Sequence, residues 1–239
     1  MSNRLTFWAR LLATAFPLAA CAATPGTCAD PGARPVAIAA SYGGPIEFEV
    51  TRNGEPVGRH VTTFTQRDGH LAVKSELEIA LRVLFITIYR YHYVSEDLWC
   101  GGRLAAIDSR VDDNGERFAL AGRLDGERFV VTAAGAHESM AAGILATNHW
   151  NPDVLGRHEV LNTLTGRLNR VTLTPCGGES LPVGNGTRAA SCFDYTGDLQ
   201  ARVWYDAAGR WTGLQFAGRD GSPIRYTCRR CGEPAGGGA

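Results

Sequence analysis

Short segments in which apolar and polar residues alternate follow one another along most of this 239-residue chain. Ile46, Phe48 and Val50 alternate with glutamates, and similar short apolar segments recur at 118–120, 129–131, 168–173, 203–205, 214–216 and 224–226. Asn-Gly and Asp-Gly pairs stand between many of them, and such pairs suit the positive φ angles of tight hairpins. The pattern predicts an all-β protein, an antiparallel meander of roughly ten to twelve strands that forms a curved half-barrel or barrel.

The segment 71–93 is too long to be one straight strand. Nearly all of its odd positions are apolar or aromatic, and its even positions change from polar to apolar at Leu84, Ile86 and Ile88. At about 3.3 Å per residue a straight strand would span about 75 Å, so we predict a bend or break near residues 80–82. Beyond the bend we expect burial on both faces, under a second sheet, a helix, a bound lipid chain or a partner.

The meander has one irregular insertion, residues 133–155. Its apolar part, residues 140–146, predicts a short helix capped by Ser139. A loop of this length is a natural lid or plug for a curved sheet. We expect His149 and Trp150 to pack there with their polar atoms hydrogen-bonded.

The insertion also leaves two chemical alternatives open. An envelope hydrolase would use His149 with Asp153 or Glu138. A metal site would add His137 and His158 to this set, but the spacings match no ligand pattern. The chain has no Gly-x-Ser-x-Gly elbow, phosphate loop or HExxH motif. We therefore predict no catalytic residues, no metal site and no cofactor.

The first residues predict export. Arg4 and Arg10 precede a short apolar run that ends in Leu18-Ala19-Ala20-Cys21, which has the form of a bacterial lipobox. We predict a signal peptide over residues 1–20, lipidation of Cys21, and a place on the periplasmic face of the outer membrane. The alternative is an ordinary secretory signal and a soluble periplasmic protein. A tether (21–43), one β-domain (44–232) and a disordered tail (233–239) would follow.

Seven cysteines support export, because removing Cys21 leaves an even set of six that can oxidise in pairs. The six candidates for disulfides are Cys28, Cys100, Cys176, Cys192, Cys228 and Cys231. The preferred pair is Cys176–Cys192, on either side of a glycine-rich loop. If the meander closes or nearly closes, its N-terminal tail lies near the last strand, which would bring Cys28 to Cys228 or Cys231 and leave the remaining partner to Cys100.

Charge excludes one class of partner. The whole chain has a formal net charge of +0, and without Arg4 and Arg10 it holds 22 basic against 24 acidic residues. Because the arginines are spread along the chain, no basic patch predicts nucleic-acid binding. Cys228-Arg229-Arg230-Cys231 follows a hairpin with no helix after it, so it predicts a structural disulfide rather than a redox or zinc site.

Several short motifs resemble those of an uncharacterised family of exported bacterial β-proteins, known only as a domain of unknown function. The motifs are Glu96–Trp99, Gly102-Arg103-Leu104, His149-Trp150-Asn151, Leu161–Gly166, Trp204-Tyr205-Asp206 and Gly209-Arg210-Trp211, and the match covers about residues 44–228. His149 stands where the family usually has a small residue or tyrosine. The resemblance implies a fold and no activity. A looser likeness in architecture is to the half-barrels of lipoprotein carriers and receptors, which hold acyl chains under a lid.

Together these patterns predict a non-catalytic envelope protein that binds an apolar or amphipathic ligand, such as a lipid, on a curved sheet. The candidate ligand-binding residues are Leu84, Ile86, Ile88, Tyr89, Tyr91, Tyr93, His149 and Trp150. The alternatives are a structural or assembly lipoprotein that docks another envelope protein, and an envelope hydrolase.

Overall fold

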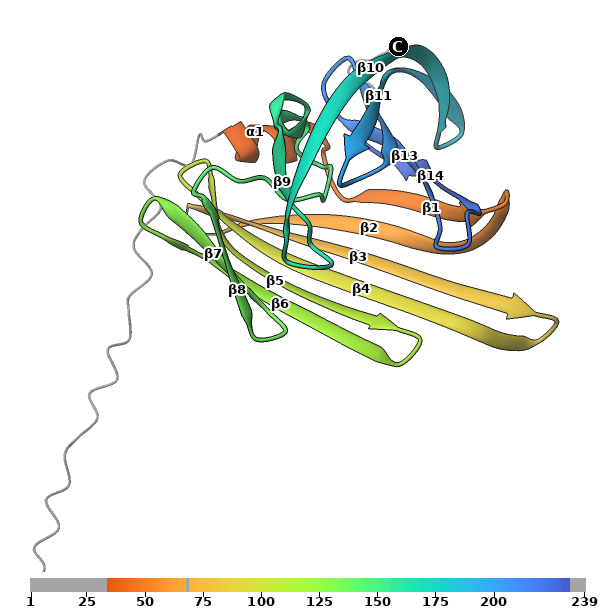
Figure 1. Cartoon of the computed structure of the whole chain (residues 1–239). Helices are drawn as coiled ribbons and strands as arrows, with labels where there is room; N and C mark the ends of the chain where they lie inside the picture. The colour runs from red at the N-terminus through yellow and green to blue at the C-terminus, as the bar shows by residue number, and fades with distance from the viewer. Residues whose placement is uncertain (1–33, 68, 233–239) are drawn as a thin grey trace, which may run out of the picture.

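The computed structural model describes residues 34–67 and 69–232, which form one antiparallel sheet and one short α-helix, α1 (Arg34–Ser41) (Figure 1). A 3₁₀ turn, η1 (Pro152–Gly156), precedes the ninth strand. The strands are β1 (Ile46–Arg52), β2 (Glu55–Arg67), β3 (His70–Val83), β4 (Ile86–Cys100), β5 (Arg103–Asp113), β6 (Glu116–Asp125), β7 (Arg128–Ala133), β8 (Ala136–Ala141), β9 (Glu159–Leu161), β10 (Leu168–Val183), β11 (Gly186–Gly197), β12 (Ala201–Asp206), β13 (Trp211–Ala217) and β14 (Pro223–Arg230). The predicted fold class, an all-β antiparallel meander, is confirmed.

The order of the strands places the two ends of the sheet in the middle of the chain. The order is β8-β7-β6-β5-β4-β3-β2-β1-β14-β13-β12-β11-β10-β9, so β1 pairs with β14 in the centre. The two edge strands, β8 and β9, are consecutive in sequence and do not pair with each other. The sheet curves strongly, and the β10–β11 hairpin arches over β13 and β14 (Figure 1). We call the line between the β8 end and the β9 end the seam.

Turn chemistry sets most of the hairpins. Asn53 and Asn114 take φ angles of 52° and 54°, and each precedes a glycine that also has positive φ. Asparagine and glycine tolerate this left-handed region better than other residues. These pairs therefore end β1 and β5 where the sequence predicts a turn.

The predicted bend near residues 80–82 is instead a full reversal slightly further on. Leu84 and Phe85 form a two-residue turn between β3 and β4, so the segment 71–93 is a hairpin rather than one bent strand. A register shift does occur between Leu81 and Arg82. The segment 71–93 thus contributes to two strands instead of one. With β8 and the short β9 the described residues form fourteen strands, above the ten to twelve expected.

The predicted helix over residues 140–146 is wrong. Met140 lies in β8 with its side chain buried, and the chain then crosses to β9 as an irregular loop. Met140 pairs with Phe129 of β7, which is also fully buried. Pairing at this sheet edge therefore overrides the helical propensity of the Ala-rich sequence.

The folded unit begins before the predicted domain boundary at residue 44. Tyr42 is buried in the core, where its hydroxyl donates to the carbonyl oxygen of Trp150 and accepts from the backbone N–H of Trp211. Arg34 pairs with Asp153 in η1. Residues 34–43 are thus part of the domain rather than of the predicted tether. The predicted signal peptide, Cys21 and the tail 233–239 lie outside the described residues.

Candidate functional site

The inside of the curved sheet is filled with large side chains. Trp150 and Trp211 are fully buried, as are Tyr42, Phe48 and Phe129. Trp150 comes from the loop between β8 and β9, and its ring packs against Phe64 of β2 and Trp99 of β4. The insertion is therefore a plug, as predicted, and it occupies the concave face that would hold an acyl chain in a carrier.

Two buried histidines lie in this core and flank Trp211. The ring centroids of His60 and His149 are 5.4 and 5.5 Å from that of Trp211. Burial lowers the pKa of His60 to about 3 and that of His149 to about 4, so both rings are neutral at pH 7. The Nδ1 atoms of both have no hydrogen-bond partner among the described residues, so the expectation that the polar atoms of His149 are hydrogen-bonded is wrong.

A buried polar network fastens the plug to the sheet. Asp97 of β4 accepts hydrogen bonds from Ser95 at 2.5 Å and from the side chain of Asn148 in the plug at 2.7 Å. The Tyr93 hydroxyl is hydrogen-bonded to the side-chain oxygen of Asn148 and to the hydroxyl of Thr163, both at 2.9 Å. Burial raises the pKa of Asp97 to about 6 although both hydrogen bonds oppose the shift. The network orients the loop, and the five side chains that form it are all buried.

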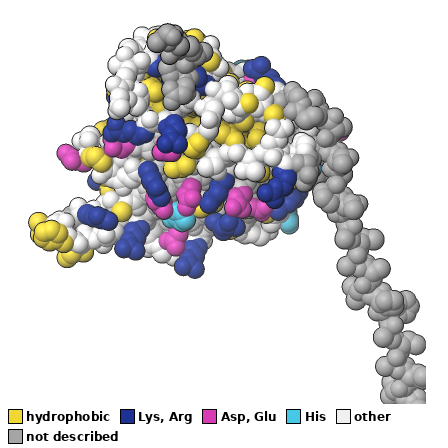
Figure 2. All heavy atoms as spheres, turned by 180° about the vertical axis from the view of Figure 1, so that it is seen from behind, with side chains coloured by type: hydrophobic (Ala, Val, Ile, Leu, Met, Phe, Trp, Pro, Cys, Tyr) yellow, Lys and Arg dark blue, Asp and Glu magenta, His cyan; other side chains and the backbone are white. Residues whose placement is uncertain are grey.

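The predicted ligand-binding residues do not form one site. Leu84, Ile86 and Ile88 were expected to be buried on both faces of the sheet, but they are 87%, 69% and 56% exposed at the tip of the β3–β4 hairpin. The burial prediction is wrong because the tip extends beyond its neighbouring strands, where nothing in the described chain covers it. In the space-filling view the tip is a yellow end on a projection (Figure 2). Their role in binding stays a prediction.

The other candidates lie nearer the core. Tyr89 and Tyr91 are partly buried, and Tyr93, His149 and Trp150 are buried. The hydroxyl of Tyr89 donates a hydrogen bond to Asp113 at 2.8 Å. Burial is the main cause that raises the pKa of Tyr89 to about 12. Tyr93 belongs to the polar network and Trp150 to the plug, so both are structural in this fold.

A surface groove of about 660 Å³ lies at the seam. Ala141 at the end of β8, Ile144 in the plug and Val171 of β10 are apolar residues that line it. Around these apolar residues the groove is lined by Arg157, His158, Glu159 and Arg170. Glu159 lies 3.9 Å from Arg170, whereas Arg157 has no ion-pair partner among the described residues. The groove thus combines an apolar wall with a mostly cationic rim, and we call it the seam groove.

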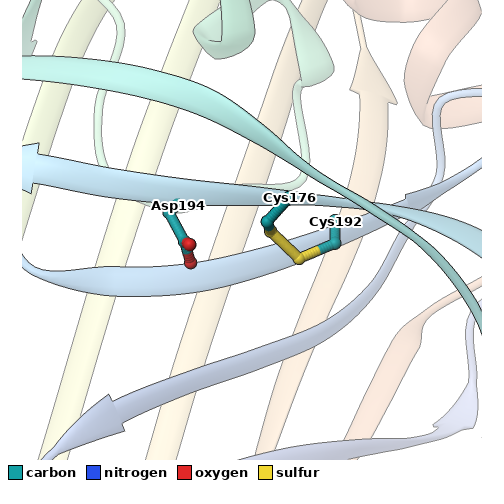
Figure 3. A group of neighbouring side chains, drawn as sticks. All are labelled: Cys176, Cys192 and Asp194. Atoms are coloured by element: carbon teal, nitrogen blue, oxygen red, sulfur yellow. A yellow bond between two sulfur atoms is a disulfide. The ribbon is translucent and has the colours of Figure 1, made fainter.

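The cysteines are part of the scaffold. The predicted pair Cys176–Cys192 is confirmed and joins β10 to β11 (Figure 3). Cys228 and Cys231 pair with each other, so the predicted bonds from Cys28 to one of them and from Cys100 to the other are wrong. Cys100 is also disulfide-bonded, and Cys28 lies outside the described residues.

Two groups of potential metal ligands have competing partners. Asp194 lies beside the Cys176–Cys192 bond, but disulfide sulfurs are not thiolates and the carboxylate accepts two hydrogen bonds from Arg202 (Figure 3). The second group, on β3 and β4, is Glu76, Glu78 and His92. Its carboxylates pair with Lys74 at 3.2 Å and Arg59 at 3.0 Å. Neither group leaves its charges free for a cation.

The structure does not assemble the hydrolase alternative. No hydrogen bond among the described residues joins His149 to Asp153 or Glu138. Asp153 pairs with Arg34, and Glu138 accepts a hydrogen bond from the backbone N–H of Leu168. His137 and His158 are exposed, in contrast to His149.

Sequence reasoning missed the rim of the seam groove and the tip residue Phe85. Arg157 and Arg170 come from different segments, and only the folding of β9 against β10 brings them to one groove. Phe85 is 100% exposed, yet it stood in an apolar run that was interpreted as a buried strand. Residues 80–88 hold no Gly, Asn, Asp or Pro, so no turn signal in the sequence marks Phe85 as exposed.

Fold and site together define a β-barrel-like protein with a plugged interior. The chain is similar to the crystal structure of a beta-barrel-like protein of the domain of unknown function DUF1849 from Brucella abortus, with a TM-score of 0.54 and 8% sequence identity. The match covers 77% of this chain and 94% of that one, and at this identity it shows the fold alone. No curated protein matches the chain. The family model of the domain of unknown function DUF6134 matches residues 48–229, and the chain belongs to that family.

The predicted resemblance to an uncharacterised family of β-proteins is thereby confirmed, and its motifs have structural roles here. Asp206 accepts hydrogen bonds from the backbone and side chain of Arg210 and so holds the β12–β13 turn. The side chain of Asn162 accepts from the backbone N–H groups of Leu164 and Thr165 in the turn after β9. The family signature therefore maintains the plug and the turns. It identifies no reactive group.

Proposed function

We propose that this protein is a non-catalytic envelope module that binds an amphipathic molecule in the seam groove. The observation that carries the proposal is that apolar residues and the cationic Arg157 and Arg170 line the same groove. A volume of about 660 Å³ falls within the range of small-molecule sites, about 300–1,000 Å³. The ligand would place its acyl or other apolar part against Ile144 and its acidic head between the arginines.

The filled interior supports a groove on the surface rather than carriage inside the sheet. Export, lipidation of Cys21 and a place at the outer membrane are part of the proposal and rest on the leader sequence. Because His149 joins neither nearby carboxylate, its surroundings favour a structural role over hydrolysis.

Native mass spectrometry of the protein purified from its own membrane tests the proposal directly. We expect a retained non-covalent mass that belongs to an acidic amphiphile. A protein that carries only its own covalent lipid would contradict ligand binding.

A charge-reversal pair locates the site, with oleate as the probe. We expect Arg157→Glu with Arg170→Glu to weaken oleate binding about tenfold, since each exposed charge contributes up to about 1 kcal/mol. The matched control is Arg103→Glu with Arg117→Glu, two exposed arginines outside the groove. Equal binding by both double variants would place the ligand elsewhere.

A second candidate function is assembly with another envelope protein, and the free edge of β8 favours it. β8 is the last strand of the sheet on its side, so its outer backbone groups are open to an added strand. Photo-crosslinking from residue Ser139 in β8 tests this. A partner captured there, with a groove empty in native mass spectrometry, would favour assembly over ligand binding.

A further inference from the structure

The tip of the β3–β4 hairpin stands away from the sheet as a two-stranded ribbon. β2 pairs with β3 only as far as Ile79, and β5 pairs with β4 only from Tyr91 onward. Residues 80–90 therefore have no neighbouring strand on either side, and at about 3.4 Å per residue the ribbon extends about 17 Å beyond Ile79. Figure 1 shows β3 and β4 running past the strands beside them.

The tip of this ribbon is apolar and uncovered. Leu84 and Phe85 form the turn and are 87% and 100% exposed, and Ile86 and Ile88 follow on β4. An exposed cluster of large apolar side chains is uncommon on a soluble surface and marks a contact site. We call these four residues the apolar tip.

The turn itself is costly for an apolar residue. Leu84 takes a φ angle of 55°, a region that glycine and asparagine adopt more easily. Other hairpins of this sheet place Asn53-Gly54 and Asn114-Gly115 at their turns. A leucine at such a position gives up local backbone stability and keeps apolar surface at the extreme end of the ribbon.

Cations flank the apolar tip. Arg82 on β3 and Arg90 on β4 are exposed, and neither has an ion-pair partner among the described residues. Between the two arginines along the ribbon, the hydroxyl of Tyr89 is fixed by Asp113, which is itself paired with Arg219 at 2.7 Å. The order along the ribbon is thus apolar end, then arginine and tyrosine, then the folded sheet.

From this order we propose that the apolar tip inserts into the interfacial region of an anionic lipid bilayer, with Arg82 and Arg90 on the phosphate groups. Lipid fits better than a protein pocket because Phe85 is free of protein contacts on all sides, and hydrocarbon surrounds an inserted side chain in the same way. Tyrosine and arginine are the side chains that favour the headgroup level.

The ribbon also limits the depth of insertion. The outer backbone groups of a two-stranded ribbon are unpaired, and unpaired backbone groups are strongly disfavoured in hydrocarbon. Insertion therefore ends at the turn and the first residues of each strand, a depth comparable to the 5–10 Å typical of interfacial anchors. The tip is a membrane contact rather than a membrane span.

The test uses the chain from residue 22 onward, which contains every described element and cannot be lipidated at Cys21. Its partitioning is measured by flotation with vesicles of 30% phosphatidylglycerol and 70% phosphatidylethanolamine, and with vesicles of phosphatidylcholine alone. We expect Leu84→Asp with Phe85→Asp to lower the partition coefficient at least about a hundredfold, since each large apolar side chain contributes about tenfold or more. Because both side chains are exposed, and aspartate tolerates positive φ better than leucine, the variant should remain folded.

The matched control is Phe118→Asp with Leu164→Asp, which removes the same two residue types and adds the same charge away from the tip. These two residues are 49% and 47% exposed. We expect this control to bind like the unaltered chain. Arg82→Gln with Arg90→Gln should weaken binding about fivefold per arginine, on the anionic vesicles only.

A depth measurement separates insertion from surface adsorption. Phe85→Trp should add a fluorescence component that brominated lipids quench. The proposal is wrong if the two aspartate double variants bind vesicles equally, or if the new tryptophan is not quenched. It is also wrong if sedimentation shows a dimer that Leu84→Asp with Phe85→Asp dissociates, since the tip would then join two copies of the chain. None of these outcomes depends on the seam groove.

Discussion

At the scale of single residues, His60 makes the stability of the folded protein depend on pH. Its pKa falls from 6.5 in the unfolded chain to about 3 in the folded one, because burial disfavours the charged ring. The folded state therefore binds fewer protons than the unfolded state between these values. The resulting stability is fully present above pH 6.5 and is lost as the pH falls toward 3. His149 acts in the same direction, whereas Asp97, with a raised pKa, stabilises below about pH 4 and loses that contribution as the pH rises through 6.

We predict that His60→Phe reduces the acid sensitivity of the fold. Phenylalanine keeps the ring contacts with Phe48, Trp211 and Tyr226, and the Nδ1 that it replaces has no partner. The free energy of unfolding is measured with urea at pH 7 and at pH 4.5. Between these two pH values we expect it to fall by about 2–3 kcal/mol less in the variant than in the unaltered protein. His158→Phe is the exposed control and should leave the difference unchanged. An equal loss in His60→Phe would mean that this ring is charged in the folded state.

The core and its chemistry were predictable from sequence to different extents. Alternating apolar positions such as Ile46, Phe48 and Val50 are buried as their period requires. Leu84 and Phe85 follow the same apolar pattern and are exposed, because a pattern of residue types does not record whether a neighbouring strand exists. The pairing of His149 with Trp211 depends on a loop crossing the inside of the sheet, which spacing along the chain does not encode.

At the scale of elements, Gly58 marks the place where the ribbon leaves the sheet. It pairs with Ile79, the last residue of β3 that β2 reaches. A Cβ at Gly58 would lie 1.9 Å from the backbone oxygen of Glu78 and 3.0 Å from the Cα of Ile79, so β2 and β3 approach too closely there for a side chain. Glycine is needed here for close approach, independent of any turn.

We predict that Gly58→Ala destabilises the protein by about 1–3 kcal/mol, because rigid backbone atoms must move to admit the methyl group. Gly178→Ala in β10 is the control, since its nearest backbone oxygen lies at an ordinary 3.6 Å and should cost little. Urea unfolding gives the free energy of unfolding of each variant, and we expect its dependence on urea concentration, the m value, to be the same for both. Equal stability of both would show that β2 and β3 separate easily at Gly58.

The elements also show where turn signals succeed and fail. Asn-Gly pairs located the β1–β2 and β5–β6 hairpins from sequence alone, because few residues accept their backbone angles. The β3–β4 turn carries no such signal, and the Ala-rich segment after Ser139 favours a helix that strand pairing prevents. Local chemistry therefore predicts an element only where tertiary contacts do not outweigh it.

At the scale of the whole molecule, the sheet order makes the chain ends its centre and the middle of the chain its edge. β1 and β14 pair over six residue pairs, and Glu49 of β1 pairs with Arg229 of β14 through their side chains. The seam, in contrast, is held by the plug and by a hydrogen bond that the backbone N–H of Leu168 donates to the side chain of Glu138. The edge strand β8 has only one strand neighbour.

This arrangement predicts how the molecule opens. Local opening starts where few backbone hydrogen bonds and contacts must break, so amide hydrogens of β8 should exchange with solvent earlier than those of β1 and β14. Hydrogen exchange read by mass spectrometry after pepsin digestion measures the order. Glu138→Gln keeps an acceptor for Leu168 and should change little, whereas Glu138→Ala should speed exchange in β8 and leave β1 unaffected. If β1 and β14 exchange first, the centre of the sheet is not its most stable part. If they exchange last, a ligand that fills the seam groove would slow β8 specifically, because the groove begins at Ala141.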